Sequence, residues 1–176
     1  MATPDIILRA PEPSDVDAMY VWENIESEWI HGISRAPLSR QFLWDYVQSY
    51  NPDIFSVGQL RLIIADAVSG EALGCVDLYE FDSLNRRAGV GIVIAPCHRG
   101  RGIATEALDM LSHYCFYQVG MHQLWAHVAV GNKPSQSVFE ACGYRISGRL
   151  RSWIRTGESY ADVFVYQRLL TPDCQE

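Results

Sequence analysis

The sequence has 176 residues, of which 48% are hydrophobic and 20% charged, and its formal net charge is −7 with a pI of about 5.2. This length suffices for one hydrophobic core and favours a single domain over residues 1–176. The acidic balance disfavours direct binding to nucleic acid, because phosphate recognition needs a basic surface. A small-molecule or peptide amine fits the sign of the charge.

The cysteines and the hydropathy indicate the compartment. Five cysteines are present, and no two have Cys-x-x-Cys spacing. We find no signal segment and no apolar run long enough to span a bilayer. We therefore expect a cytoplasmic protein with free thiols, without a metal site and without a membrane partner.

The first third of the chain predicts one strand and two helices. Residues 6–8 form a short apolar run typical of a strand. Ser14 is a candidate N-cap for the first helix, and Ser39 for the second. Residues 28–37 between the helices predict a loop that could form a pocket wall.

The middle of the chain has the short turns of an antiparallel meander. The expected strands cover residues 60–65, 72–81 and 88–95. Apolar residues at every fourth position then predict an amphipathic helix from residue 103 to about residue 120. A strand at 124–130 follows, and the succession strand, helix, strand predicts a parallel pair.

The last third predicts a short helix and two strands. The helix covers residues 134–142, begins at a proline and ends at Gly143. The strands cover 144–154 and 160–170. The expected fold class is therefore α/β, a mixed sheet that is mostly antiparallel with one parallel pair. Such sheets bind ligands where the strand order changes.

The strongest chemical signal follows the third meander strand. Gly100 and Gly102 open the amphipathic helix, where glycine permits a positive φ and close approach of a ligand. The first N–H groups of a helix lack partners within it, so they can hold phosphate oxygens, and Arg99 and Arg101 add positive charge. Alone, this pattern is often only a tight turn. It is neither a P-loop nor a dinucleotide fingerprint, which would need glycine at Thr105.

Two segments together resemble the GNAT superfamily of N-acetyltransferases. Arg99, Gly102 and Ala104 fit its Arg/Gln-x-x-Gly-x-Gly/Ala pyrophosphate loop. Residues 132–144 resemble its Asn-x-x-Ser/Ala … Gly-Phe/Tyr helix, which packs against the CoA arm. Within the family, the chain looks most like the spermidine/diamine and ribosomal-protein branches, and residues 74–94 resemble the polyamine enzymes without a gap. The resemblance covers essentially the whole chain and is weakest in the first third.

The resemblance implies a GNAT-type fold with one splayed parallel pair of strands, acetyl-CoA as co-substrate and a primary amine as acceptor. Backbone groups of the splayed strand would pair with the pantetheine arm. Relatives of this kind occur as homodimers or larger homo-oligomers. The expected CoA-binding residues are Ile92, Val93, Ile94, Arg99, Gly100, Arg101, Gly102, Ile103, Ala104, Thr105, Asn132, Ser135 and Phe139.

The family reaction is direct attack of the amine on the acetyl carbonyl, which an N–H near Val93 or Ile94 would polarise. A base removes the amine proton, and an acid protonates the departing thiolate. The usual acid is a tyrosine seven residues after the motif Asn132, where this chain has Phe139. Ser135 is the nearest alternative, although capping of the helix explains it at least as well. Departure without an acid is also open.

Three carboxylates near the end of the second meander strand are candidates for the base or for amine recognition. They are Asp77, Glu80 and Asp82, and Glu80 and Asp82 share strand parity. A solvated strand face explains them as well. His127 is a weaker candidate, since a histidine satisfied by its surroundings explains it more readily.

Other residues leave alternatives open. Trp29, His31 and Tyr46 could wall the acceptor pocket, although core packing explains Tyr46 and Trp44 equally well. The cysteines need no catalytic role, because the family forms no acyl-enzyme. A catalytically weak acyl-CoA-binding sensor, which Phe139 favours, and an unrelated phosphate-binding module are the alternative functions.

Overall fold

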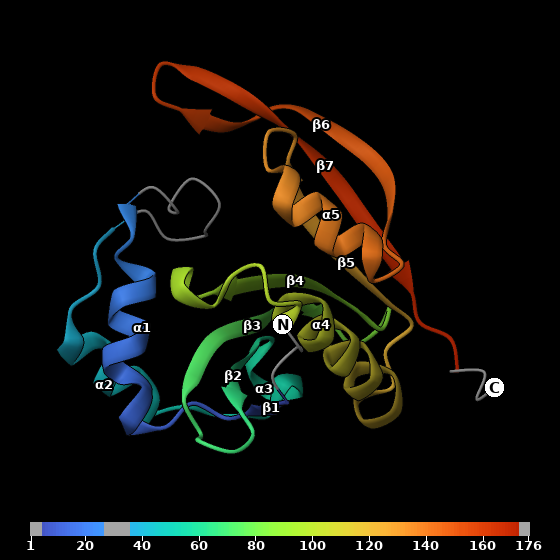
Figure 1. The fold of residues 1–176 in the computed structure, drawn as a ribbon. Helices are drawn as coiled ribbons and strands as arrows, with labels where there is room; N and C mark the ends of the chain where they lie inside the picture. The colour runs from blue at the N-terminus through green and yellow to red at the C-terminus, as the bar shows by residue number, and fades with distance from the viewer. Residues whose placement is uncertain (1–4, 27–35, 173–176) are drawn as a thin grey trace.

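A computed structural model describes residues 5–26 and 36–172 of the chain. Single 3-10 turns lie at Pro13–Asp15 and Pro96–His98, and a π-helical turn lies at Cys115–Val119. The elements in chain order are β1 (Ile6–Arg9), α1 (Val16–Glu23), α2 (Arg40–Gln48), α3 (Ile54–Val57), β2 (Leu60–Asp66), β3 (Ala72–Asp82), β4 (Arg87–Ile94), α4 (Ile103–Tyr114), β5 (Gln123–Ala129), α5 (Lys133–Ala141), β6 (Arg145–Thr156) and β7 (Ser159–Leu169) (Figure 1).

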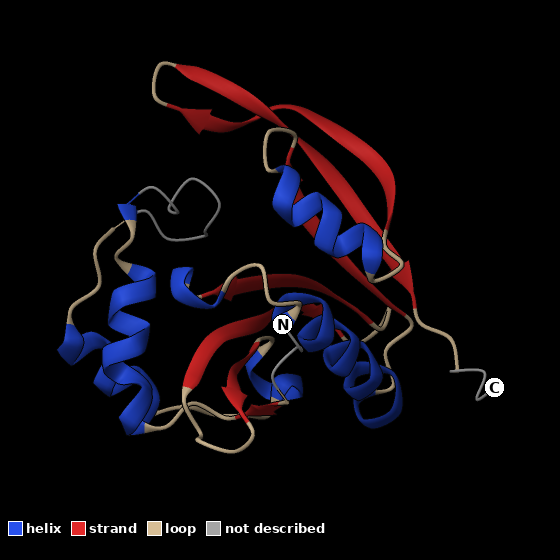
Figure 2. Ribbon diagram, viewed as in Figure 1, coloured by secondary structure: helices blue, strands red, loops and turns tan. Residues whose placement is uncertain are grey.

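The strands form one sheet of seven in the order β1-β2-β3-β4-β5-β7-β6. Neighbouring strands are antiparallel except β4 and β5, which are parallel. The expected mixed sheet is therefore confirmed. The β6–β7 hairpin extends as an arm beyond the rest of the sheet (Figure 2).

The parallel pair opens after three residues. β4 pairs with β5 only from Arg87↔Gln123 to Gly89↔Trp125. β4 continues to Ile94 and β5 to Ala129 without further pairing between them. The expected splay is confirmed, and it leaves one edge of β4 without a strand partner in the second half of its length.

Helices cover both faces of the sheet with separate cores. On one face α4 and α5 pack against β3, β4 and β5 through residues such as Leu78, Leu108 and Leu124. On the other face α1 and α2 cover a smaller cluster that includes Met19 and Ile63. Burial of each such side chain stabilises the fold by about 1.5–3 kcal/mol.

The start of α1 differs from the expectation. Ser14 lies inside the 3-10 turn and does not cap the helix. The buried Asp15 carboxylate organises this turn, because it accepts a hydrogen bond from the Glu12 N–H at 2.8 Å and forms an ion pair with Arg9 at 2.7 Å. The second cap is confirmed, since Ser39 Oγ accepts from the Phe42 N–H at 3.0 Å.

The short helix α3 was not expected, because four residues are too few to establish a helical period. The amphipathic helix does end near Gly120, which has φ of 73° and closes the π-helical turn after α4. Across residues 5–26 and 36–172, no helix has the length and apolar character needed to cross a bilayer.

Candidate active site

A cavity of about 830 Å³ lies against the unpaired part of β4. Its walls come from that strand, the loop before α4, the start of α5 and the end of α1. All the residues expected to bind CoA line it, namely Ile92, Val93, Ile94, Arg99, Gly100, Arg101, Gly102, Ile103, Ala104, Thr105, Asn132, Ser135 and Phe139. The fold thus gathers two distant sequence motifs around one space.

The loop between β4 and α4 has a geometry suited to an anionic ligand. Gly100 and Gly102 have φ of 73° and 79°, and Gly102 is the N-cap of α4. Among the described residues, none accepts a backbone hydrogen bond from the N–H groups of residues 100–104. A run of such donors at a helix N-terminus binds phosphate oxygens, so the loop fits the diphosphate of CoA.

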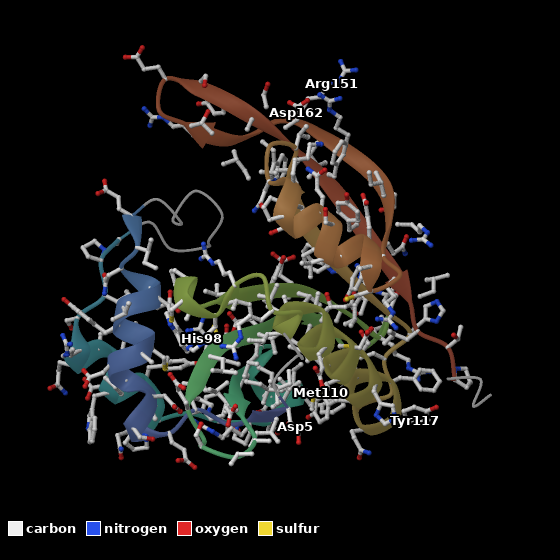
Figure 3. The ribbon with its side chains drawn as sticks, viewed as in Figure 1. Asp5, His98, Met110, Tyr117, Arg151 and Asp162 are labelled. Atoms are coloured by element: carbon white, nitrogen blue, oxygen red, sulfur yellow. The ribbon has the colours of Figure 1, made fainter. Side chains whose placement is uncertain are left out.

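The two arginine side chains of this loop, Arg99 and Arg101, form polar contacts with neighbouring residues. The Arg99 Nε donates to the Ile94 carbonyl at 3.0 Å. Arg101 Nη1 lies 3.1 Å from Nδ1 of His98, which is labelled in Figure 3, and His98 Nε2 lies 3.4 Å from Glu71. These contacts hold two positively charged guanidinium groups beside the cavity.

Asn132 is the N-cap of α5. Its side-chain oxygen accepts from the Ser135 N–H at 3.2 Å, so the proposed capping role of Ser135 is wrong. Phe139 is buried and its ring packs on Tyr144 and Tyr166, with centroids 5.0 Å and 6.3 Å apart. Phe139 therefore forms an apolar wall of the cavity.

Asp77 belongs to an ion-pair network that reaches the cavity indirectly. Its carboxylate accepts two hydrogen bonds from Arg61, at 2.7 and 2.8 Å. Arg61 also binds Glu23 at 2.6 Å, and Glu23 lines the cavity. Burial alone would lower the pKa of Arg61, but the surrounding Asp77, Cys75 and Glu23 raise it, so the guanidinium stays charged.

The sequence patterns did not predict the ion pair between Arg61 and Glu23. A charged residue inside the apolar run of β2 was the available signal for Arg61, because a strand interior tolerates a charge only when it is paired. Glu23 was less clearly indicated, because this residue only continues the helical spacing of α1 and belongs to no recognisable motif. Trp22 beside it also lines the cavity.

The expectation that Glu80 and Asp82 face one cleft is wrong. A β-bulge in β3 places four residues, from Tyr79 to Asp82, opposite three of β4, and the Glu80 φ of 49° breaks the strand alternation. Asp82 binds Asn85 at 2.7 Å and Arg87 at 3.1 Å and so organises the turn. Neither carboxylate lines the cavity.

His127 lies in a row of aromatic rings away from the cavity lining. Its ring centroid is 4.7 Å from Trp125 and 6.4 Å from Trp153, and Trp125 meets Tyr79 edge to face at 5.2 Å. Burial lowers the pKa of His127, and the charge of Glu80 opposes this. The imidazole is therefore biased toward its neutral form.

The other residues considered for the site differ in burial and position. Tyr46 is half-buried beside Arg61, at 5.9 Å from its guanidinium, whereas Trp44 is exposed, so core packing does not explain Trp44. Trp29 and His31 lie outside the described residues. Burial raises the pKa of the Cys75 thiol to about 12, which keeps it protonated. In the described part of the chain, no three His, Cys, Asp or Glu side chains form a group that could hold a metal.

The fold and the cavity define a class of protein: a mixed sheet opened between two parallel strands, with a cavity at the opening whose glycine loop is suited to an anionic group. The sequence matches the acetyltransferase (GNAT) domain family over residues 5–145. The chain therefore belongs to the acetyltransferase (GNAT) domain family.

Relatives of known name agree with this membership. The chain is 32% identical over 114 residues to a spermidine N(1)-acetyltransferase of Vibrio cholerae, covering 65% of each sequence. It is 26% identical over 100 residues to the ribosomal-protein-serine acetyltransferase of Escherichia coli, covering 57% of this chain and 56% of that one. In sequence, then, the chain matches less than two thirds of the length of either relative.

Similarity to a solved structure covers more of the chain than the sequence matches do. The crystal structure of spermidine N-acetyltransferase from Vibrio cholerae in complex with CoA and spermine has a TM-score of 0.82 to this chain at 26% identity. The match covers 94% of this chain and 95% of that one. The similarity in fold therefore extends through the region before β2, where the sequence motifs are least informative.

Proposed function

We propose that the protein transfers the acetyl group of acetyl-CoA to a primary amine, with both substrates bound together. The observation that carries this proposal is the single cavity that joins the donor-rich loop of residues 100–104 to the unpaired edge of β4. When bound, acetyl-CoA supplies a thioester that is already activated toward amines. Positioning by the protein then supplies much of the rate.

The chain's residues have distinct tasks in this proposal. Backbone N–H groups of residues 100–104, with Arg99 and Arg101, bind the diphosphate. Ile92, Val93 and Ile94 offer backbone groups that pair with the amides of the pantetheine arm, as an added strand would. Binding of this kind fixes the reacting groups and excludes water from between them.

For proton transfer to the departing sulfur, the motif offers Ser135. Ser135 carries a hydroxyl on the cavity wall close to Phe139, which cannot donate a proton. We propose that Ser135 donates to the departing sulfur, directly or through water. Asn132 caps the helix, so the Ser135 hydroxyl is not needed as the cap.

Polyamines are the acceptors we propose first. The relatives named above include enzymes for spermidine and for a ribosomal protein, so both acceptor classes follow from the family. The formal net charge of −7 favours a cationic small molecule.

The test is release of CoA from acetyl-CoA in the presence of spermidine, and separately of a peptide with a free N-terminus. We expect amine-dependent release, with a product heavier by one acetyl group in mass spectrometry. Binding of CoA without acetylation of any amine would instead favour the acyl-CoA-binding sensor. Failure to bind CoA would overturn the proposal.

A further inference from the structure

One titratable side chain of the cavity wall has no task in the proposed reaction. His98 follows β4 in the 3-10 turn Pro96–His98 and lines the cavity together with Arg101 and Gly102. Its side chain is 14% exposed, so the imidazole lies among its neighbours and is not a free surface group. Each of its ring nitrogens faces a charged side chain, and these two contacts define what the imidazole can do.

The contact with Arg101 determines which ring nitrogen of His98 carries the proton. Arg101 Nη1 lies 3.1 Å from His98 Nδ1, and a guanidinium group has only donors. Nδ1 must therefore accept this hydrogen bond, which it can do only in the neutral imidazole whose proton is on Nε2. Nε2 in turn lies 3.4 Å from a carboxylate oxygen of Glu71, where an N–H is favoured. Contacts thus run from Glu71 through His98 to Arg101.

Arg101 keeps most of its donors for a ligand. Among the described residues, His98 Nδ1 is the only acceptor that hydrogen-bonds to its guanidinium group, and Asp66 at the end of β2 interacts with it electrostatically. The guanidinium lies at the cavity wall beside the loop that we assign to the diphosphate. A contact that restrains this side chain before the ligand arrives reduces the entropy lost on binding.

The charged groups near His98 come from three parts of the chain. Glu71 precedes β3, Arg99 and Arg101 belong to the loop before α4, and Glu23 at the end of α1 lines the same cavity. If His98 takes up a second proton, Nδ1 becomes a donor and the ring gains a positive charge, which Glu71 favours. The imidazolium then repels Arg101 and no longer accepts its hydrogen bond. Protonation therefore releases Arg101 from this position.

We propose that neutral His98 is a positioning residue that holds the Arg101 guanidinium at the diphosphate end of the cavity, while Glu71 favours the required tautomer. Protonation of His98 then weakens the binding of CoA. This inference rests on the proposed function, because it takes the loop of residues 100–104 as the diphosphate site. Histidine changes its charge between about pH 5 and 8, so the effect falls in this range.

A double-mutant cycle, measured by calorimetry with CoA as the probe, tests the contact. His98→Leu removes the acceptor and should raise the Kd of CoA by about three- to tenfold at about pH 8. In the Arg101→Gln background the same change should have no further effect, because His98 acts through Arg101. A histidine that only supports the fold would weaken binding by the same factor in both backgrounds, and that result overturns the proposal.

His98→Asn is the conservative variant that should restore the contact. Its amide oxygen can take the place of Nδ1 and accept from Arg101, but it does not titrate. From about pH 8 to about pH 5.5, the wild type should lose about three- to tenfold more affinity for CoA than His98→Asn loses. The phosphate monoester of CoA titrates near pH ~6 with both proteins, so the comparison cancels its effect. A wild-type affinity that falls no more than that of His98→Asn, or that rises, overturns the proposal.

His122→Leu is the control for the loss of a histidine. His122 is exposed just before β5 and does not line the cavity. We expect this variant to bind CoA with the affinity and the pH dependence of the wild type. A change equal to that of His98→Leu would mean that the effect is not specific to His98, and would overturn the proposal.

These measurements follow the binding of CoA without turnover, so they separate this proposal from the proposed function. If the wild type binds CoA with the expected pH profile but acetylates no amine, the proposed function fails and the role of His98 stands. If the wild type acetylates an amine and the substitutions of His98 leave the Kd of CoA unchanged, only the role of His98 fails. A wild type that does not bind CoA overturns both.

Discussion

At the scale of single residues, three side chains of the α5 motif have different contacts in the structure. Asn132 caps the helix, Ser135 lies on the cavity wall and Phe139 packs among Tyr144 and Tyr166. The tyrosine usual at position 139 is thus replaced by an apolar ring. In the proposed reaction, a protein group that protonates the leaving sulfur must come from elsewhere, and Ser135 is the nearest such hydroxyl along the motif.

Ser135→Ala tests this assignment. General acids contribute about 10²–10⁴-fold to rates, so we expect kcat to fall by about 100-fold with little change in the KM for acetyl-CoA. Ser137→Ala is the matched control, since Ser137 is exposed on the same helix and does not line the cavity. Equal kcat values for the two variants would assign proton donation to water.

At the scale of elements, the approach of β3 to β4 explains why glycine occurs in β4. A Cβ on Gly89 would lie 2.4 Å from the Tyr79 ring and 2.9 Å from Trp125. Glycine at this position lets the Tyr79 ring lie across β4 and meet Trp125 edge to face. These rings lie at the last paired position before the strands diverge.

Gly89→Ala should therefore destabilise the protein. Overpacking of this kind costs about 1–3 kcal/mol of the free energy of unfolding, measured by urea denaturation. Gly91→Ala is the control, because the nearest atom to its Cβ would lie 3.9 Å away. The account of the strand junction is wrong if both variants have the same stability.

At the scale of the whole molecule, the cavity exists only when α1, β4 and α5 are assembled. Its ligand should therefore stabilise the folded chain by mass action. CoA at about 100 times its dissociation constant adds ~2.7 kcal/mol, which corresponds to a rise in Tm of about 5–10 °C for a chain of this size.

Arg101→Gln should reduce this shift, because it removes a positive charge beside the proposed diphosphate site. Arg151→Gln should not, since Arg151 is exposed on β6 in the arm, far from the loop (Figure 3). The comparison uses differential scanning fluorimetry at one CoA concentration. A shift that is equally reduced in both variants would indicate non-specific binding.

The local patterns of the sequence determined the order of the elements apart from α3, the glycine loop and the parallel pair. Turn residues, helical spacing and the Pro and Gly that bound helices act over a few neighbours, so they are visible without a structure. The resemblance of the two motifs then sufficed for the expected CoA-binding residues, all of which line one cavity.

Only the tertiary structure decided where the carboxylates near the cavity lie. The bulge at Glu80, the pairing of Asp77 with Arg61 and the arrival of Glu23 at the cavity depend on contacts between α1, β2 and β3. Carboxylates far apart in sequence carry no periodic signal. Their role depends on which cation lies near each one, and that is decided by packing of the elements and not by local sequence.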